Sequence, residues 1–270
     1  MITPSLMCWS PNTMRGMHVS DLPDRTQDYL KVIYDLGEWN SGPVTSTRIG
    51  DVLGQKASTV SEALKRLVQQ GLIVHEAYKP IELSSTGRPL ALQMVRRHRL
   101  LEMYLCEYVG YSWDEVHDEA EHLEHAVSDT FVERIAALMG NPTSDPHGDP
   151  IPDKEGNVAE TDPGLPLDTA QEGDVVRIVR IADRDSGLLR YLATKGIVPG
   201  VNVAVLPRPY GGMMNIQLVP EGEGTSGAAR ETGATGAKNF VEKTFAPAGT
   251  ENGVGIASIS AASARDIRVK

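Results

Sequence analysis

The chain has 270 residues, of which 40% are hydrophobic and 23% are charged, the composition of a globular protein long enough for two or three domains. Its formal net charge of −10 argues against a broadly basic surface for nucleic acid, although a local basic patch remains compatible with that total. The chain lacks an apolar run of roughly 18 residues that could span a membrane, and its two cysteines, Cys8 and Cys106, are expected to be reduced thiols in a cytoplasmic protein.

The N-terminal part predicts a disordered lead followed by helices. Residues 1–20 show no apolar periodicity and form the expected lead. Apolar residues then recur at helical spacing over residues 24–39, which predicts a first helix. Thr45 is a candidate N-cap for a short second helix that ends at Gly54.

A third helix and a hairpin complete this part. A cap at Ser58, or just before it, opens a helix over residues 59–70, and Gly71 is a natural residue to follow its end. Residues 72–77 and 81–83 have the composition of two strands joined by a turn.

Three helices followed by a hairpin are the order of a winged helix-turn-helix, so we expect a DNA-binding domain over residues 21–85. In that arrangement the third helix reads DNA: its polar side chains can reach base edges or phosphates, and its cations suit phosphates. The alternatives are a helical domain without a nucleic-acid role and, for Ser58, a pure N-cap. The candidate DNA-binding residues are Lys56, Ser58, Thr59, Ser61, Glu62, Lys65 and Arg66.

Residues 86–141 predict a helical domain. A long helix runs from residue 86 to about residue 108, where Gly110 breaks it, and helices over residues 113–125 and 128–138 follow.

The helix over residues 113–125 contains a run of histidines and acids. With His117 at zero on a helical wheel, Glu121 falls at about 40°, Glu124 at about −20° and His125 at about 80°. Two imidazoles and two carboxylates therefore share one face, while His122, at about 140°, lies off it.

The preceding helix repeats this pairing, since His98 and Glu102 are four residues apart. Nitrogen and oxygen donors on two helices indicate a divalent transition-metal site. The alternative is a solvated acidic helix face.

The C-terminal part changes composition. Residues 142–170 predict a tether rich in Pro, Gly and Asp, and residues 171–270 predict a small five-stranded, SH3-like barrel. A flexible insertion is expected at about residues 221–253, and residues 256–270 close the barrel with a last strand at Ile267 and Val269. The predicted fold class is thus mainly α with a small β domain.

Specific strings in this order resemble the diphtheria toxin repressor family of metal-dependent transcription factors. The resemblance covers residues 22 to about 206. It rests on DYLKVIYDL (28–36), STVSEALKRL (58–67), MVRRHRLLE (94–102), VHDEAEHLEHAVSD (116–129) and DPHGDPIP (145–152).

The resemblance implies two metal sites. The primary site would consist of Asp28, Glu121, Glu124 and His125, and an ancillary site would consist of His98, Glu102 and His117 with a carboxylate from the tail. Asp183 is the candidate for that carboxylate, with Asp185 as the second choice and an ordinary surface-loop aspartate as the alternative. The resemblance also makes His147 a loop residue rather than a ligand.

The resemblance further implies the metal. Iron-responsive members of the family have Met and Cys where this chain has Asp28 and Glu121, and oxygen in place of sulfur favours Mn²⁺. Lys31 replaces a carboxylate found in another manganese-responsive pattern, which favours two separated sites over a closely spaced pair. We therefore expect a manganese-dependent repressor of manganese transport genes, with an iron-dependent repressor (Fe²⁺) as the alternative.

The family binds palindromic operator DNA as a homodimer, and apolar residues of the later helices, among them Leu100, Leu101 and Phe131, could supply the dimer surface or fill the monomer core. Two other classes compete with a repressor. A di-metal enzyme would need the ExxH motif on two helices, and only one is found. A winged helix that contacts proteins alone would bind no DNA.

Overall fold

The computed structural model describes residues 17–39, 42–76, 78–159, 162–208, 212–219 and 256–270. The chain divides into two compact units, one of Met1–Arg96 with Pro152–Asn157 and the other of Arg97–Ile151 with Val158–Lys270. The predicted insertion at 221–253 and all but the last four residues of the predicted lead lie outside the described residues, and Val19–Asp21 form a 3₁₀ turn.

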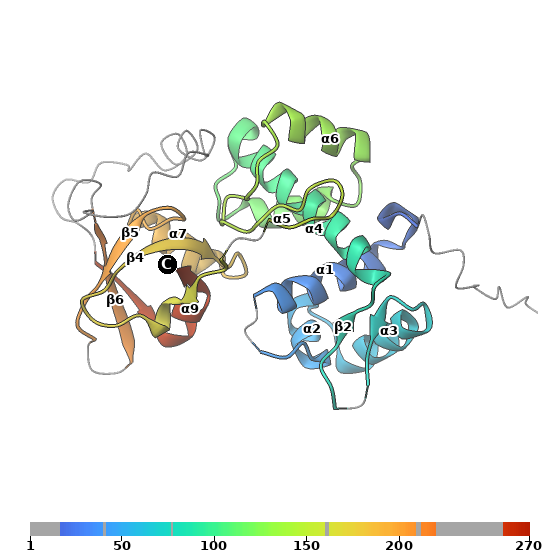
Figure 1. Cartoon of the computed structure of the whole chain (residues 1–270), viewed down its shortest axis with the longest axis horizontal. Coiled ribbons are helices and arrows are strands. Elements are labelled where there is room, and N and C mark those ends of the chain that lie inside the picture. The colour runs from blue at the N-terminus through green and yellow to red at the C-terminus, as the bar shows by residue number, and fades with distance from the viewer. Residues whose placement is uncertain (1–16, 40–41, 77, 160–161, 209–211, 220–255) are drawn as a thin grey trace, which may run out of the picture. The chain divides into compact units, whose positions relative to one another are not determined.

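The first unit contains the predicted winged helix-turn-helix (Figure 1). Its elements are α1 (Asp24–Glu38), α2 (Ser46–Leu53), α3 (Ala57–Gln69), β1 (Ile73–Val74) and β2 (Glu82–Leu83). Helix α1 contacts α2, and α2 contacts α3. The apolar face of α3 is buried and consists of Val60, Ala63, Leu64 and Leu67.

Local chemistry explains where these helices begin and end. Thr45 caps α2, as predicted, because its side-chain oxygen accepts a hydrogen bond from the Arg48 backbone N–H at 3.3 Å. Gly54 ends α2 in the left-handed region, with φ of 61°. Of the two starts considered for α3, at Ser58 or just before it, the structure has the second: Lys56 is the N-cap residue, without a side-chain cap hydrogen bond, and Ser58 lies inside the helix.

The wing is shorter than predicted. β1 and β2 pair antiparallel over two residues each, in the register Ile73↔Leu83 and Val74↔Glu82. The predicted strand over 72–77 stops at Val74, and Tyr78 at the turn has a positive φ of 64°. At the tip, Lys79 forms an exposed ion pair with Glu76 at 2.6 Å.

Helix α4 (Gly87–Tyr104) crosses the boundary between the units and continues into a π-helical turn, Leu105–Val109, before Gly110 ends it as predicted. α5 (Val116–Leu123) and α6 (Asp129–Leu138) follow. Helix α5 is shorter than the predicted 113–125, because the chain turns after Leu123 toward α6, which Ser128 caps. Glu124 and His125 therefore lie in that turn.

The core of this helical part is buried and apolar. Leu100, Leu101, Met103, Leu105 and Ile135 belong to it, so they fill the core rather than form the dimer surface considered from sequence. Phe131, on α6, is 39% exposed.

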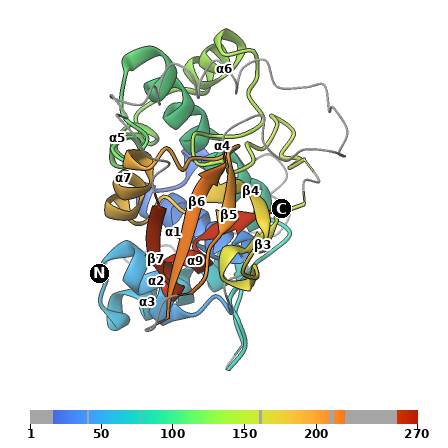
Figure 2. The same ribbon diagram turned by 90° about the vertical axis from the view of Figure 1, so that its left-hand side faces the viewer.

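The C-terminal part is an antiparallel sheet with strand order β3-β8-β4-β5-β6-β7, one strand more than predicted. Figure 2 shows β5, β6 and β7 side by side. The prediction missed β7 as a strand separate from β8, because a short helix divides the two. The bounds are β3 (Leu165–Pro166), β4 (Val175–Ile181), α7 (Ser186–Thr194), β5 (Asn202–Val205), β6 (Met213–Val219), β7 (Ile256–Ser260), α9 (Ala261–Arg265) and β8 (Ile267–Val269).

Trp113 joins the helical part to this sheet. Its side chain is 1% exposed and belongs to the apolar cluster of the sheet, with Ile178 and Ile181 of β4. Residues 97–151 and the sheet therefore share a core, which accounts for their place in one compact unit.

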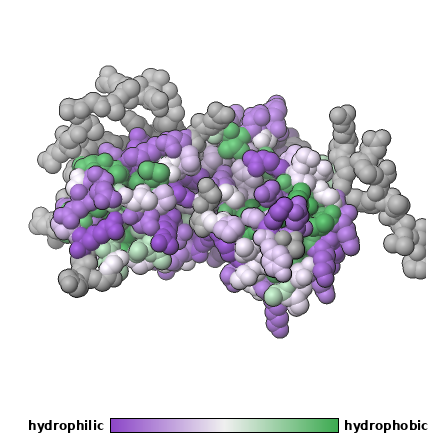
Figure 3. Space-filling view, turned by 60° about the horizontal axis from the view of Figure 1, so that its bottom comes forward, coloured by the Kyte–Doolittle hydropathy of each residue, from purple (hydrophilic) through white to green (hydrophobic). Residues whose placement is uncertain are grey.

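The surface is mixed in character. The face seen in Figure 3 alternates hydrophilic areas with smaller hydrophobic ones. Among the residues that the structure describes, no helix combines the length and the apolar character needed to cross a membrane.

Candidate metal centre and DNA-reading helix

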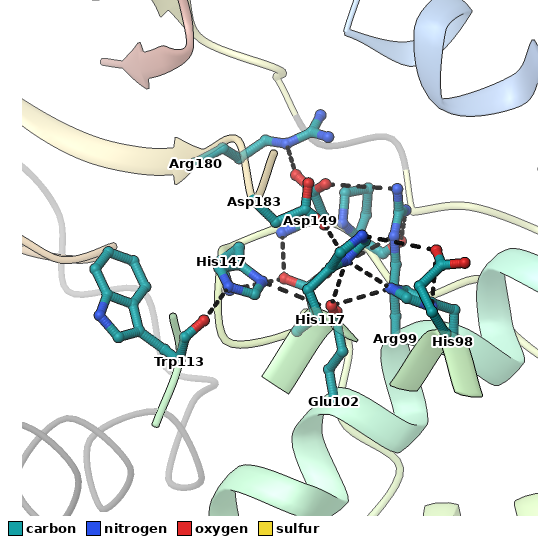
Figure 4. A network of polar contacts seen from close by, with 12 residues as sticks. His98, Arg99, Glu102, Trp113, His117, His147, Asp149, Arg180 and Asp183 are labelled. Atoms are coloured by element: carbon teal, nitrogen blue, oxygen red, sulfur yellow. Dashed lines mark hydrogen bonds and ion pairs between the residues drawn. The ribbon is translucent and has the colours of Figure 1, made fainter. Parts of the chain in front are cut away.

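Four donors from three elements converge in the second unit. His98 and Glu102 lie one turn apart on α4, His117 lies on α5, and Asp183 follows the end of β4 (Figure 4). One ligand atom from each lies within 4.8 Å of the others. The predicted ancillary residues are thus brought together; their role as ligands stays a prediction.

The distances show how tightly these donors gather. Nδ1 of His117 lies 3.0 Å from Oδ2 of Asp183 and 3.3 Å from Oε1 of Glu102. Nε2 of His98 lies 3.0 Å from the same Glu102 oxygen and 3.2 Å from Nδ1 of His117. One imidazole proton at His117 cannot serve all of these acceptors, so the cluster has more lone pairs than protons.

This donor set fits a divalent cation. Two imidazole nitrogens with two carboxylates suit Mn²⁺, Fe²⁺ and Zn²⁺. The second oxygen of Glu102, Oε2, is buried and has no hydrogen-bond partner, an arrangement that is costly for a buried carboxylate without a cation.

The protonation of the cluster reflects opposite charges at short range. Burial alone would lower the pKa of His117, but the carboxylates of Asp183 and Glu102 outweigh it and raise that pKa to about 12. For Glu102, burial alone would raise the pKa, but the neighbouring His98 and His117 outweigh burial and hold this pKa well below its usual range. The pKa of Asp183 is also depressed, because His117 outweighs its burial.

A second group of donors lies on the other side of His98. Its Nδ1 is 2.6 Å from Oε2 of Glu124 and 4.0 Å from Oε1 of Glu121. Nε2 of His125 is 3.6 Å from Oε1 of Glu124. Three of the predicted primary residues are therefore neighbours, and His98, predicted for the ancillary site alone, touches both groups.

Two further candidates belong to other elements. Asp28 lies on α1 in the first unit, where its carboxylate is 3.8 Å from Arg25, and its role as a ligand stays a prediction. Asp185, the second choice for the tail carboxylate, caps α7 instead: its side chain accepts a hydrogen bond from Leu188 N–H at 3.0 Å.

Sequence reasoning missed the surroundings of Glu102. His147 is a loop residue, as predicted, but it is 1% exposed and its Nδ1 lies 3.9 Å from Oε2 of Glu102. Its Nε2 donates to the Trp113 carbonyl at 2.7 Å. The only sequence signal was the histidine within the DPHGDPIP string.

His122, excluded by the wheel, is exposed and donates from Nδ1 to the Asp118 carbonyl at 2.6 Å.

The candidate DNA-binding side chains are all exposed. Lys56 precedes α3, and the other six lie along it, outside its buried face. A polar helix surface with three cations suits contact with phosphates and base edges. These seven assignments stay predictions.

Comparison with known proteins agrees with this organisation. Residues 21–81 match the family model described as the iron dependent repressor N-terminal DNA binding domain, and residues 84–153 match its metal binding and dimerisation domain. Residues 165–226 match the FeoA domain. The iron-dependent repressor IdeR of Mycobacterium tuberculosis is 33% identical over 206 residues, which cover 72% of this chain and 89% of that protein. The diphtheria toxin repressor of Corynebacterium diphtheriae is 36% identical over 149 residues, 55% of this chain and 66% of that protein.

Solved structures with the same fold include manganese regulators. A manganese-dependent transcriptional repressor in complex with manganese has a TM-score of 0.72 and 38% identity, covering 90% of this chain and 98% of that one. The manganese regulator SloR has a TM-score of 0.67 and 27% identity, covering 91% of this chain and 97% of that one.

Proposed function

The chain belongs to the iron-dependent repressor family, which includes the diphtheria toxin repressor, and we propose that Mn²⁺ is the metal to which it responds and that it then binds operator DNA as a homodimer. As a member of this family it is a metal-dependent transcriptional repressor and not an enzyme. The genes it controls would be those of manganese transport.

The oxygen-rich donor set supports manganese. Glu121 and Glu124 place two carboxylates beside His98. By the resemblance, iron-responsive members of the family have a sulfur donor at the position of Glu121. Carboxylate oxygen is a harder donor than thiolate sulfur, and Mn²⁺ binds weakly except at oxygen-rich sites. This substitution is the observation that carries the proposal.

The residues of the chain suggest how metal and DNA are linked. A bound dication supplies the positive charge that offsets the clustered carboxylates. Asp28 lies on α1, which contacts α2, which in turn contacts α3. If Asp28 is a ligand, then metal occupancy and the position of α3 are coupled, and the affinities for metal and for DNA must change reciprocally.

Iron is the second candidate, because the relative from M. tuberculosis and two of the matching family models are named for iron. The test is fluorescence anisotropy of labelled promoter DNA from the chain's own gene region, titrated anaerobically with the protein and Mn²⁺, Fe²⁺ or Zn²⁺ at matched free concentrations. We expect Mn²⁺ to give the tightest binding.

The variant Asp28→Ala tests the predicted role of Asp28. It should keep the circular dichroism spectrum of the parent protein and lose the Mn²⁺ response in DNA binding. If Fe²⁺ activates DNA binding more strongly than Mn²⁺, iron is the metal to which the protein responds. If DNA binding does not depend on any of the three metals, the proposal is refuted.

A further inference from the structure

A short buried loop over residues 145–151, which we name the docking loop, lies beside the candidate metal centre. Its shape is fixed internally: Oδ1 of Asp145 accepts hydrogen bonds from the backbone N–H groups of His147 at 2.9 Å and of Asp149 at 2.8 Å. The N–H of Asp145 donates to the Asp149 carbonyl at 2.9 Å. Because these hydrogen bonds hold the loop in one conformation, it can fix the positions of the elements that it contacts.

The docking loop lies directly against the backbone of β4. The N–H of Ile181 donates to the His147 carbonyl at 2.9 Å. Gly148, with φ of 89°, approaches so closely that a Cβ atom would stand 2.1 Å from the Val179 carbonyl oxygen. Only glycine fits both the conformation and the space. Strand β4 shifts register against β8 between Ile178 and Arg180, at the level of this contact.

Buried ion pairs join the same loop to both neighbouring elements. Nε of Arg180, on β4, donates to Oδ1 of Asp149 at 2.5 Å (Figure 4). Arg99, on α4, lies 3.6 Å from the other oxygen of Asp149 and donates to the Pro150 carbonyl at 2.6 Å. All three charged residues are at most 6% exposed, so water does little to weaken these interactions.

The loop thereby connects α4, which carries His98 and Glu102, to β4, the strand that precedes Asp183. Arg99 is next to His98 on α4, and Asp183 comes two residues after β4 ends at Ile181. The loop also reaches the other carboxylate of the cluster, because His147 Nδ1 lies 3.9 Å from Oε2 of Glu102. Asp183 is the one donor of the four that comes from the sheet, so its distance to His117 depends on how β4 is held.

We propose that the docking loop positions Asp183 for the cluster of His98, Glu102 and His117, and that Arg180, Asp149 and Gly148 are positioning residues for metal binding although none of them is a ligand. The proposal rests on the proposed function, since it requires that this cluster binds the metal. Metal ligands need outer partners to hold their geometry, and loss of such a partner typically weakens affinity by about 10- to 100-fold.

The test is a double-mutant cycle on Mn²⁺ affinity, measured from the free-ion signal in electron paramagnetic resonance. Every protein carries His125→Ala, which removes one donor from the neighbouring group and so weakens metal binding there. Arg180→Met is the main variant, because Asp149 keeps its partner Arg99. Asp149→Asn is the second variant, and it preserves the shape of the loop if Arg180→Met does not fold.

A matched control uses another contact between the sheet part and the helical part. Arg190, on α7, pairs with Asp114 at 3.0 Å, and neither residue belongs to β4 or to the docking loop. Arg190→Gln should bind Mn²⁺ within about twofold of its parent, because an exposed pair contributes little. Circular dichroism and the melting temperature without metal establish that each variant is folded.

We expect Arg180→Met to weaken Mn²⁺ binding about tenfold. Combined with Asp183→Asn it should bind no more weakly than Asp183→Asn alone, within about twofold, because it acts through that residue. The proposal would be overturned if the losses of Mn²⁺ affinity from Arg180→Met and Asp183→Asn multiply in the double variant. It would also be overturned if Arg180→Met binds Mn²⁺ as tightly as its parent. If Asp183→Asn has no effect, the docking loop has nothing to position and the proposal also fails, while the DNA measurements still decide the proposed function.

Discussion

His98 lies between the two groups of donors. Its Nδ1 lies 2.6 Å from Glu124 and its Nε2 lies 3.0 Å from Glu102, so a single imidazole faces both groups of donors. A neutral imidazole has one proton and one lone pair, and the partner of one nitrogen therefore constrains what the other can do. The spacing of His98 and Glu102 on a helix predicted their common face, but a wheel cannot show which second helix approaches each nitrogen.

The pKa of His117 leads to a prediction about pH. Without metal this pKa is raised to about 12, so the imidazole is protonated through the neutral range and must lose its proton to act as a ligand. Mn²⁺ binding should therefore release a proton, and affinity should rise with pH by up to about tenfold per unit for each proton released. Calorimetry in buffers of different ionisation enthalpy measures the release.

The control for this prediction is His117→Gln, which has no proton to lose there and should show a smaller pH dependence. Equal proton release by both proteins, or none by the parent, would contradict the assignment of His117 as a ligand.

At the scale of elements, the sequence predicted the helices better than their ends. The wheel drawn from His117 assumed one helix through His125, but α5 ends at Leu123 and the last two donors lie in the following turn. Periodicity reports the face of a helix and not the point at which tertiary contacts end it. The docking loop escaped prediction for a related reason: Arg99 and Arg180 are distant in sequence from Asp149, and only the fold shows that they pair with it.

The turn between α2 and α3 allows a stability test. Gly54 has φ of 61°, and replacing it with alanine places a Cβ in the left-handed region at a cost of about 1 kcal/mol. Gly54→Ala should therefore lower the melting temperature. The matched control is Gly37→Ala within α1, where nothing lies within 4 Å of the added Cβ. This substitution should instead raise the free energy of unfolding by about 0.5–1 kcal/mol. A rise in both melting temperatures would contradict the role of Gly54 in the turn.

At the scale of the whole molecule, exposed apolar side chains mark the surface expected to form the dimer. Tyr108 and Val109 in the π-helical turn are about half exposed, and Phe131 and Leu138 on α6 are 39% and 58% exposed. Tyr104 contacts both aromatic rings of this set, stacking on Tyr108 and meeting Phe131 edge-on. Aromatic and aliphatic anchors of this kind are typical of interface cores.

We predict that Phe131→Asp shifts the protein toward a monomer in sedimentation velocity and weakens operator binding. A buried charge at a dimer contact is costly, whereas the same charge at an exposed position elsewhere is not. Val175→Asp is the matched control, because Val175 on β4 is 62% exposed and lies outside this surface. A dimer that persists in Phe131→Asp would place the subunit contact elsewhere.

The domain organisation shows where composition stops being informative. Residues 142–170 have the Pro, Gly and Asp content of a tether, and the predicted boundaries that rest on this content stay predictions. Within that stretch the docking loop is buried, and Trp113 from the helical part belongs to the core of the sheet. A loop rich in such residues can equally be a tightly hydrogen-bonded connector, and the two cases differ only in the partners that the fold provides.

The pairing of β6 with β7 has a consequence for how this chain could be engineered. Gln217 pairs with Ile256 across the two strands, so the long connection between them starts and ends at neighbouring backbone positions. As a general rule, closing a loop of twice the length costs only about 0.6 kcal/mol more. Segments could therefore be inserted into or removed from this connection with little effect on the pairing of the two strands.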